Sequence, residues 1–324
     1  MTTPWQLPRF SPWAFLLALG LTCVQCDAAP ADEATGPPAW TELTPDSAPP
    51  VTNDQGTHRV PGSAKSLTRE QIDDGSNAPD WFPLKHPPAP AIVAHGSPPA
   101  VPACALCHLY SGEGHPESAN LAGQPRAYLE QQMADFKSGA RLDPARMTAI
   151  GKAASVDDAK LAAQWFSALK PTIWFHVVET GQVPKTWITA DHLRLKRPST
   201  AVEPLGRRII EVADNAELAL DRDPYSGFTS YVPVGSISEG RRLVASGADG
   251  RSVPCATCHG PQLQGMGETP RIAGLSAVYV GRQLAGFRGS ARTGPSAEPM
   301  RVAARNLTQD DILYIAAYLV SLPP

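Results

Sequence analysis

Apolar residues recur every three or four positions in several stretches of this chain, which is the period of an amphipathic helix. The clearest stretch is Arg126–Ser138, which places Leu129, Met133 and Phe136 on one face. Tyr279, Gln283, Leu284 and Phe287 form a similar stripe later in the chain. The pattern predicts a helix at each place.

Two further helices are predicted from their first turns. Ser155 lies three residues before Asp158, and Thr308 lies three residues before Asp311. This spacing is typical of a hydroxyl N-cap followed by a first-turn acid. The predicted core positions of these helices are Leu161, Trp165 and Leu169 in one, and Ile312, Ile315, Leu319 and Leu322 in the other, with Pro171 and Pro323 as stops.

An internal repeat relates these segments. The peptide CALCH at residues 104–108 returns as CATCH at residues 255–259, 151 positions later. The same register pairs Tyr128 with Tyr279, Gln132 with Gln283, Phe136 with Phe287 and Arg141 with Arg292, and after a short insertion it pairs Met147 with Met300 and Asp158 with Asp311. The ordered register predicts two copies of one helical domain.

The rest of the chain divides around these copies. We expect a signal peptide at residues 1–31, a proline-rich tail at 32–90, the first domain at 91–171, a connector at 172–235 and the second domain at 236–324. The tail is predicted to be largely irregular and flexible to about Gly75, with Trp81-Phe82-Pro83 packed against a domain. Apolar runs at 173–178, 187–189 and 208–212 predict short strands in an ordered connector, which packs on the domains or helps bind a partner.

The N-terminus has the pattern of an export signal. Arg9 precedes an apolar run at residues 13–24, which is shorter than the roughly 20 residues that span a bilayer. Ala29 and Ala31 are small residues suited to a cleavage site. We expect cleavage near Ala31 and a periplasmic protein; an uncleaved signal would instead hold the protein at the membrane.

The net charge and the cysteine content exclude some classes of function. The 28 basic and 31 acidic residues give a net charge of −3, which argues against binding nucleic-acid phosphates through a basic surface. Of the six cysteines, Cys23 and Cys26 lie in the expected signal. The other four form two C-x-x-C pairs, each followed by histidine, so no cysteine remains for a disulfide.

C-x-x-C-H is the attachment signature of c-type haem. Its two thiols can reach the two vinyl groups of one porphyrin, and the adjacent imidazole then ligates the iron. Zinc would need another ligand pair near each motif, and a redox dithiol would need a βαβ context; neither is present. We therefore predict two covalently bound haems, attached through Cys104, Cys107, Cys255 and Cys258, with His108 and His259 as axial ligands.

The predicted distal ligands are methionines. Met147 and Met300 lie at matching distances beyond the two histidines, each in a segment expected to be irregular and proline-containing. Met133 is expected in the core, and Met266 is too near its motif to reach the distal face. The alternatives for the first iron are His95 and His115, which flank the first motif.

This order of motifs resembles tandem diheme class I cytochromes c of the bacterial periplasm. The resemblance covers about residues 103–171 and 236–324: C-x-x-C-H, then L/I-A-G, then Y-x-x-x-Q-x-x-x-F, then a methionine segment and a last helix. One departure is the leading helix, which is clear at 238–246 but short, at 91–95, in the first copy.

The resemblance implies a mostly α fold of two small helical domains, each around one haem with His/Met ligation. It implies electron transfer without catalysis, between partners such as a dehydrogenase donor and a cytochrome or terminal oxidase acceptor. An alternative is a cytochrome subunit of a periplasmic dehydrogenase complex. A second is a diheme peroxidase, which would need one iron with an open distal site.

Overall fold

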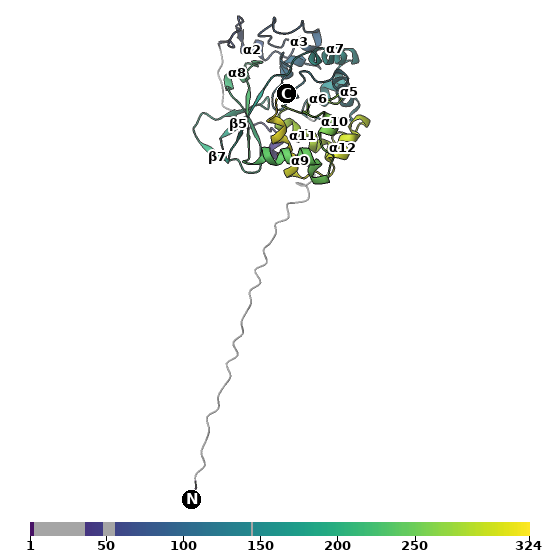
Figure 1. Cartoon of the computed structure of the whole chain (residues 1–324). Coiled ribbons are helices and arrows are strands. Elements are labelled where there is room, and N and C mark those ends of the chain that lie inside the picture. Colours follow the sequence, from purple (N-terminus) through teal and green to yellow (C-terminus); the bar gives the residue numbers. More distant parts are fainter. Residues whose placement is uncertain (3–35, 48–55, 144) are drawn as a thin grey trace.

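The structure is a computed structural model that describes residues 1–2, 36–47, 56–143 and 145–324. The described chain forms a helical body with its strands gathered on one side (Figure 1). The expected export signal, its cleavage site near Ala31, and Cys23 and Cys26 lie outside the described residues. Within the described ranges, no helix is long and apolar enough to cross a bilayer.

Both repeats fold into helices in the same order, which confirms the mostly α fold. The first contains α3 (Ala91–Ala94), α4 (Cys104–His108), α5 (Arg126–Ser138), α6 (Met147–Ala153) and α7 (Val156–Ser167). The second contains α9 (Ser236–Gly250), α10 (Ala256–His259), α11 (Ala277–Arg288), η2 (Pro295–Ala297), α12 (Glu298–Ala304) and α13 (Gln309–Val320). As expected, the leading helix α3 is much shorter than its counterpart α9.

The predicted caps begin α7 and α13. The Ser155 hydroxyl accepts a hydrogen bond from the Asp158 amide at 3.0 Å, and Thr308 does the same for Asp311 at 3.1 Å. One predicted core position is wrong: Leu161 is 49% exposed. The buried residues of α7 are Ala163, Trp165 and Phe166, which lie further along the helix, so Leu161 remains at the surface.

Helices α9 and α13 make the closest crossing of the second repeat. A Cβ added at Gly240 would lie 1.9 Å from the carbonyl oxygen of Tyr314. The missing side chain therefore lets the two backbones touch. Ile312 and Ile315 of α13 are buried at this side of the domain, as their spacing predicts.

The connector holds the predicted short strands and several more. Its elements are β3 (Phe175–Glu179), β4 (Gln182–Pro184), β5 (Thr186–Ile188), β6 (Arg194–Lys196), β7 (Val202–Pro204), β8 (Ile210–Ala213), α8 (Ala216–Leu220) and β9 (Phe228–Val232). Strands β3, β9 and β8 form one sheet in that order, with β3 and β9 parallel. The pairs β4–β7 and β5–β6 are separate two-stranded sheets.

A buried carboxylate fastens the connector to the second repeat. Glu211 of β8 is 1% exposed and accepts hydrogen bonds from the backbone amides of Ala277 at 2.8 Å and Val278 at 3.2 Å. These amides open helix α11, where an anion is favoured by the helix dipole. The connector therefore packs on a domain, as expected.

The described part of the proline-rich segment is packed, which differs from the flexible tail expected up to about Gly75. It forms η1 (Ala39–Thr41), β1 (Thr57–His58), β2 (Leu67–Thr68) and α2 (Arg69–Ile72). Thr41 and Ile72 are 0% exposed. Trp81 is buried, as expected, and its indole donates to the Asp221 carbonyl at 2.7 Å. The packing comes from isolated apolar residues. Because they follow no periodic pattern, the sequence did not predict it.

Candidate haem sites

One large cavity joins the two predicted sites. It has a volume of about 2540 Å³, compared with about 300–1,000 Å³ for ordinary ligand pockets. All four cysteines of the two C-x-x-C-H motifs line it, as do both motif histidines. Its apolar walls include Leu129, Phe136, Ile150 and Phe166 from the first repeat, and Leu243, Phe287, Ile315 and Leu319 from the second.

The two motif histidines have the same local geometry. Each lies in a short helix directly after its C-x-x-C pair and is at most 9% exposed. The Nδ1 atom of His108 donates to the Ala119 carbonyl at 2.9 Å, and that of His259 donates to the Pro270 carbonyl at 2.8 Å. A carbonyl oxygen only accepts, so the proton sits on Nδ1 and Nε2 keeps its lone pair for a metal.

Burial also keeps these imidazoles neutral. Desolvation lowers the pKa of His108 and of His259 below the ordinary 6.5, although each carbonyl contact acts in the opposite direction. A neutral imidazole is the form that coordinates iron. Both side chains are thus in the neutral form that a haem iron would require of a ligand.

The thiols do not have the properties of a reactive dithiol. Burial raises the pKa of Cys104 to about 12 and that of Cys255 to about 11. A catalytic cysteine pair needs a lowered pKa to form thiolate at neutral pH. In the described part of the chain, no three His, Cys, Asp or Glu side chains gather as a metal-ion cluster would require.

Met147 and Met300 both line the cavity, at equivalent places in the two repeats. Their segments are not irregular, as the sequence suggested: Met147 begins α6 and Met300 lies within α12. The expectation failed because Pro299 occupies the first turn of α12, where proline is tolerated. Met133, expected in the core, is half-buried and lines the cavity too.

The two histidines considered as alternative ligands of the first iron differ in their position relative to the cavity. His95 is exposed and does not line the cavity. His115 is 5% exposed, lines the cavity, and contacts Glu117 through Nδ1 at 3.1 Å. Met266 is 58% exposed, in agreement with its exclusion as a ligand.

Matched residues of the two repeats meet where the copies join. Arg141 and Arg292 form an antiparallel backbone bridge, flanked by hydrogen bonds from Leu142 to Ala291 and from Thr293 to Ala140, both at 2.7 Å. Each guanidinium also lies over an aromatic ring of its own repeat, at 4.5 Å for Arg141 over Phe136 and 4.0 Å for Arg292 over Phe287.

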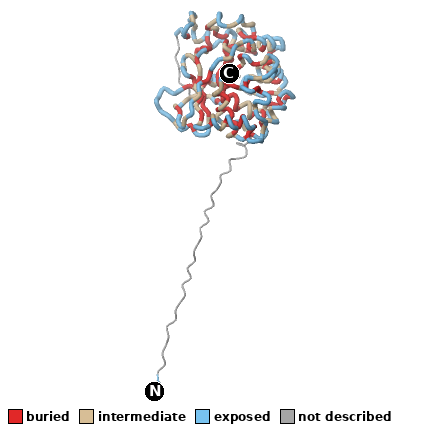
Figure 2. The backbone as a smooth tube through the Cα atoms, viewed as in Figure 1, coloured by how far each residue is buried: buried red, intermediate tan, exposed pale blue. Residues whose placement is uncertain are grey.

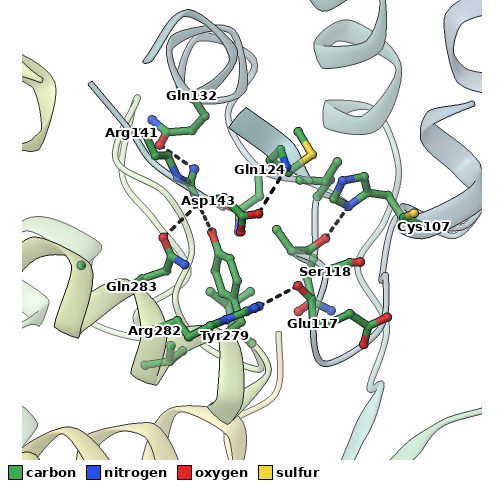
Figure 3. A pocket seen from close by; sticks show the side chains of 18 of the residues that line it. Cys107, Glu117, Ser118, Gln124, Gln132, Arg141, Asp143, Tyr279, Arg282 and Gln283 are labelled. Atoms are coloured by element: carbon green, nitrogen blue, oxygen red, sulfur yellow. Dashed lines mark hydrogen bonds between the residues drawn. The ribbon is translucent and has the colours of Figure 1, made fainter. Parts of the chain in front are cut away.

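The side chains at this junction interlock across the repeats. Arg141 donates to Gln132 at 2.8 Å in its own repeat, and to Gln283 at 2.9 Å and Tyr279 at 3.2 Å in the other (Figure 3). Arg292 donates to Gln283 at 3.0 Å and also to Gln132. The repeat register identified these positions, but it did not predict that they join the two repeats. The signal that could have shown it is a polar residue at the same position of two otherwise apolar stripes.

The junction supports the fit of haem. Arg141 and Arg292 are 7% and 6% exposed, line the cavity, and have only neutral side-chain hydrogen-bond partners among the described residues. No carboxylate hydrogen-bonds either guanidinium among these residues, although Asp143 lies close enough to act on the charge of Arg141, and two buried like charges are costly. Haem carries two propionate carboxylates, which could pair with these guanidinium groups. A covalent haem site also needs two thiols, an imidazole and an apolar wall, and each repeat contains them. The donor set therefore fits two haems.

Several known proteins are similar to this chain. The family model described as cytochrome c matches residues 237–323. The chain is 27% identical over 240 residues to a thiosulfate dehydrogenase electron acceptor from Thiomonas intermedia, covering 72% of this chain and 85% of that protein. A solved structure of cytochrome c4 from Acidithiobacillus ferrooxidans aligns with 68% of this chain and 98% of its own, at 24% identity and a TM-score of 0.45.

A smaller relative is more similar in sequence. Cytochrome c-554(548) from Halomonas halodenitrificans is 37% identical over 68 residues, which cover 21% of this chain and 82% of that protein. The match therefore spans most of a single small cytochrome. Together with the family model and the two histidine motifs, it shows that this chain belongs to the cytochrome c family.

Proposed function

We propose that this protein is a periplasmic electron carrier with two covalent haems, one in each repeat. The observation that carries the proposal is the repeated set of two thiols, one Nε2-presenting histidine and one methionine around a single cavity. When bound, haem supplies a one-electron ferric/ferrous couple. The proposed attachments are Cys104, Cys107, Cys255 and Cys258, and the proposed axial ligands are His108, Met147, His259 and Met300.

The chain's own residues set the properties of such sites. The carbonyls of Ala119 and Pro270 fix the orientation of the two imidazoles. The buried guanidinium groups of Arg141 and Arg292 balance carboxylate charge at the junction. A thioether ligand favours ferrous over ferric iron and so raises the potential. With Met147 and Met300 as distal ligands, neither iron would keep an open position for peroxide, which favours a carrier over the peroxidase alternative.

A periplasmic dehydrogenase is the proposed donor, and a cytochrome or terminal oxidase is the proposed acceptor. The support is the similarity to proteins named thiosulfate dehydrogenase electron acceptor, over most of their length. The connector and the packed N-terminal segment add surface beyond the two repeats, which suits a subunit of a dehydrogenase complex. Export would follow from the signal at residues 1–31, with cleavage near Ala31.

Two experiments test this function. The catalytic thiosulfate dehydrogenase of Thiomonas intermedia, mixed with thiosulfate and the oxidised protein, should produce the ferrous haem spectrum; no reduction would contradict that class of donor. Hydrogen peroxide turnover and carbon monoxide binding by the ferrous protein should both be negligible. Rapid carbon monoxide binding at one haem would favour the peroxidase alternative.

A further inference from the structure

The two haem motifs differ sharply in how they are covered. No residue from 101 to 115, around the first motif, is exposed. In the second repeat, Cys258 and its neighbours Ala256 and Thr257 are exposed, although the sequence repeat gives the two sites equivalent elements. Chain outside the repeats contributes to this difference, because Arg222 of the connector contacts the first motif at Leu106.

The cover over the first motif consists of residues 69–73 and 217–222, which we call the cap. It includes helices α2 and α8, which lie beside each other near α3 (Figure 1). Arg69, Asp73, Glu217 and residues 219–222 line the same cavity as Cys104 and Cys107. Residues 123–126 of the first repeat lie near residues 264–269 of the second, but residues 256–258 of its motif remain exposed.

Arg222 connects the cap to the first motif. Its guanidinium donates to the Leu106 carbonyl inside the motif at 3.0 Å, to the Ile72 carbonyl at 3.2 Å and to the Asp73 carboxylate at 3.2 Å. The side chain is 11% exposed, and its backbone has a left-handed φ of 56°. This conformation is unfavourable for arginine, so the three contacts hold a specific arrangement.

The cap is bonded internally as well. Arg69 donates to the Asp221 carboxylate at 2.6 Å and to the Leu220 carbonyl at 2.8 Å, which joins its two segments. Asp221 is 4% exposed, and its carbonyl accepts from the Trp81 indole. A layer with buried, satisfied polar groups is a fixed part of the fold.

The segment that carries the second motif is open and has no charged residue of its own between Arg251 and Glu268. Residues 252–267 contain no Asp, Glu, Lys or Arg. Val253 is 49% exposed and Met266 is 58% exposed, beside the exposed Cys258. Desolvating such a surface leaves no charge unpaired, whereas a strongly charged partner surface would lose hydration here without compensation.

We infer that redox proteins exchange electrons with this chain at the second motif, through an uncharged surface around their own redox centre, while the cap makes the first haem an internal site. Each transfer oxidises the donor by one electron and reduces the chain's haem by one. Electron transfer weakens steeply with distance, so the covered site exchanges mainly with the other haem. This inference rests on the proposed function.

Charge placed on the docking surface gives the first test. V253K and M266K should slow reduction by the catalytic thiosulfate dehydrogenase about tenfold, because an unpaired buried charge costs at least about 1.4 kcal/mol. They should also speed ferricyanide oxidation at low salt. V202K is the matched control, because Val202 is 54% exposed on the connector and should change neither rate. Equal rates in all three variants and the wild type would overturn the inference.

Salt dependence separates the two motifs without any variant. Ferricyanide oxidation of the wild type should vary little with ionic strength if exchange occurs at the uncharged second motif. The cap side of the cavity is charged instead, with Arg59, Arg69 and Arg222 beside Asp73, Glu217 and Asp221, so exchange at the first motif would depend on ionic strength. A steep dependence would therefore contradict the inference.

Accessibility gives a readout independent of electron transfer. The neutral nitroxide TEMPOL should broaden the NMR signals of the second haem's methyl groups and spare those of the first. R222A should remove the anchor of the cap and extend broadening to the first haem. Equal broadening of both haems in the wild type would overturn the docking assignment alone, whereas a haem-to-chain ratio near one would contradict the proposed function.

Discussion

Arg141 and Arg292, which occupy matching positions in the two repeats, lie opposite each other at the junction, and each bonds the glutamines of both copies, Gln132 and Gln283. Two arginines at equivalent positions of the sequence repeat are therefore also neighbours in the structure. The arrangement places two positive charges side by side in the lining of the shared cavity.

Loss of one of these guanidinium groups should weaken the junction. We expect R292Q to lower the free energy of unfolding by about 1.5–3 kcal/mol, the range for hydrogen bonds to charged groups. It should also lower the reduction potential of the adjacent haem, because a nearby cation disfavours ferric iron. Urea denaturation and redox titration measure the two effects.

The matched control is R207Q. Arg207 is 74% exposed and pairs with Asp310 at the surface, so its replacement should change stability by no more than about 0.5 kcal/mol. If R292Q and R207Q lowered the free energy of unfolding equally, the arginines at the junction would contribute no more to stability than an exposed arginine.

The crossing of α9 and α13 should not tolerate a side chain at Gly240. G240A places a methyl group against the Tyr314 carbonyl, so the helices must separate, and we expect destabilisation of about 3 kcal/mol or more, at the upper end for overpacking. In G286A the new methyl would meet its nearest neighbour at 3.5 Å, and stability should rise by up to about 1 kcal/mol. Thermal unfolding of both variants tests this; a G240A protein as stable as G286A would contradict the helix crossing.

His86 should make the stability of the first repeat depend on pH. It contacts Asp80 at 3.2 Å and stacks on Tyr110, with ring centroids 4.8 Å apart. The Asp80 hydrogen bond raises the pKa of His86 above 6.5. The stabilisation is therefore fully present below pH 6.5 and is lost as pH rises through the raised pKa.

The change should not exceed about 1 kcal/mol, because this pair is partly screened by solvent. Urea unfolding between pH 6 and 8 measures it. H86Q should remove this part of the pH dependence, and the exposed His176, changed in H176Q, should leave it intact. An unchanged pH profile in H86Q would refute the assignment.

The two methionines should act independently. Ferric haem with a methionine sulfur ligand has a weak charge-transfer band in the red, and M300A should remove about half of it and open the second iron to cyanide. M147A should do the same for the first, since the ligands belong to separate repeats. If M147A leaves the band unchanged, Met133 and His115, both on the cavity wall, become the alternative ligands.

The helices were predictable where local signals were strong. Ser155 and Thr308 cap α7 and α13 at the expected positions, and the repeat register paired Arg141 with Arg292. Leu161 was misplaced because its four-residue spacing from Trp165 fits a core stripe; Trp165 is buried as predicted, but the tertiary packing does not cover Leu161 one turn before it. Period alone does not decide how far along a helix the buried face extends.

The cap was not predictable, because its contacts join residues distant in sequence. Arg222 bonds Leu106 and Ile72, and nothing near any of the three indicates the others. The same holds for Glu211, whose partners open a helix of the second repeat. Local patterns located the candidate ligands, while the asymmetric cover of the two sites emerged only from the fold.

The central claim is that each chain carries two covalent haems. A pyridine haemochrome assay with amino-acid quantitation of the mature protein should give a haem-to-chain ratio near two, with the haem retained after acid–acetone extraction. C255A and C258A should each reduce attachment in the second repeat and leave the first loaded. A wild-type ratio near one, or haem that acid–acetone extracts, would contradict the account.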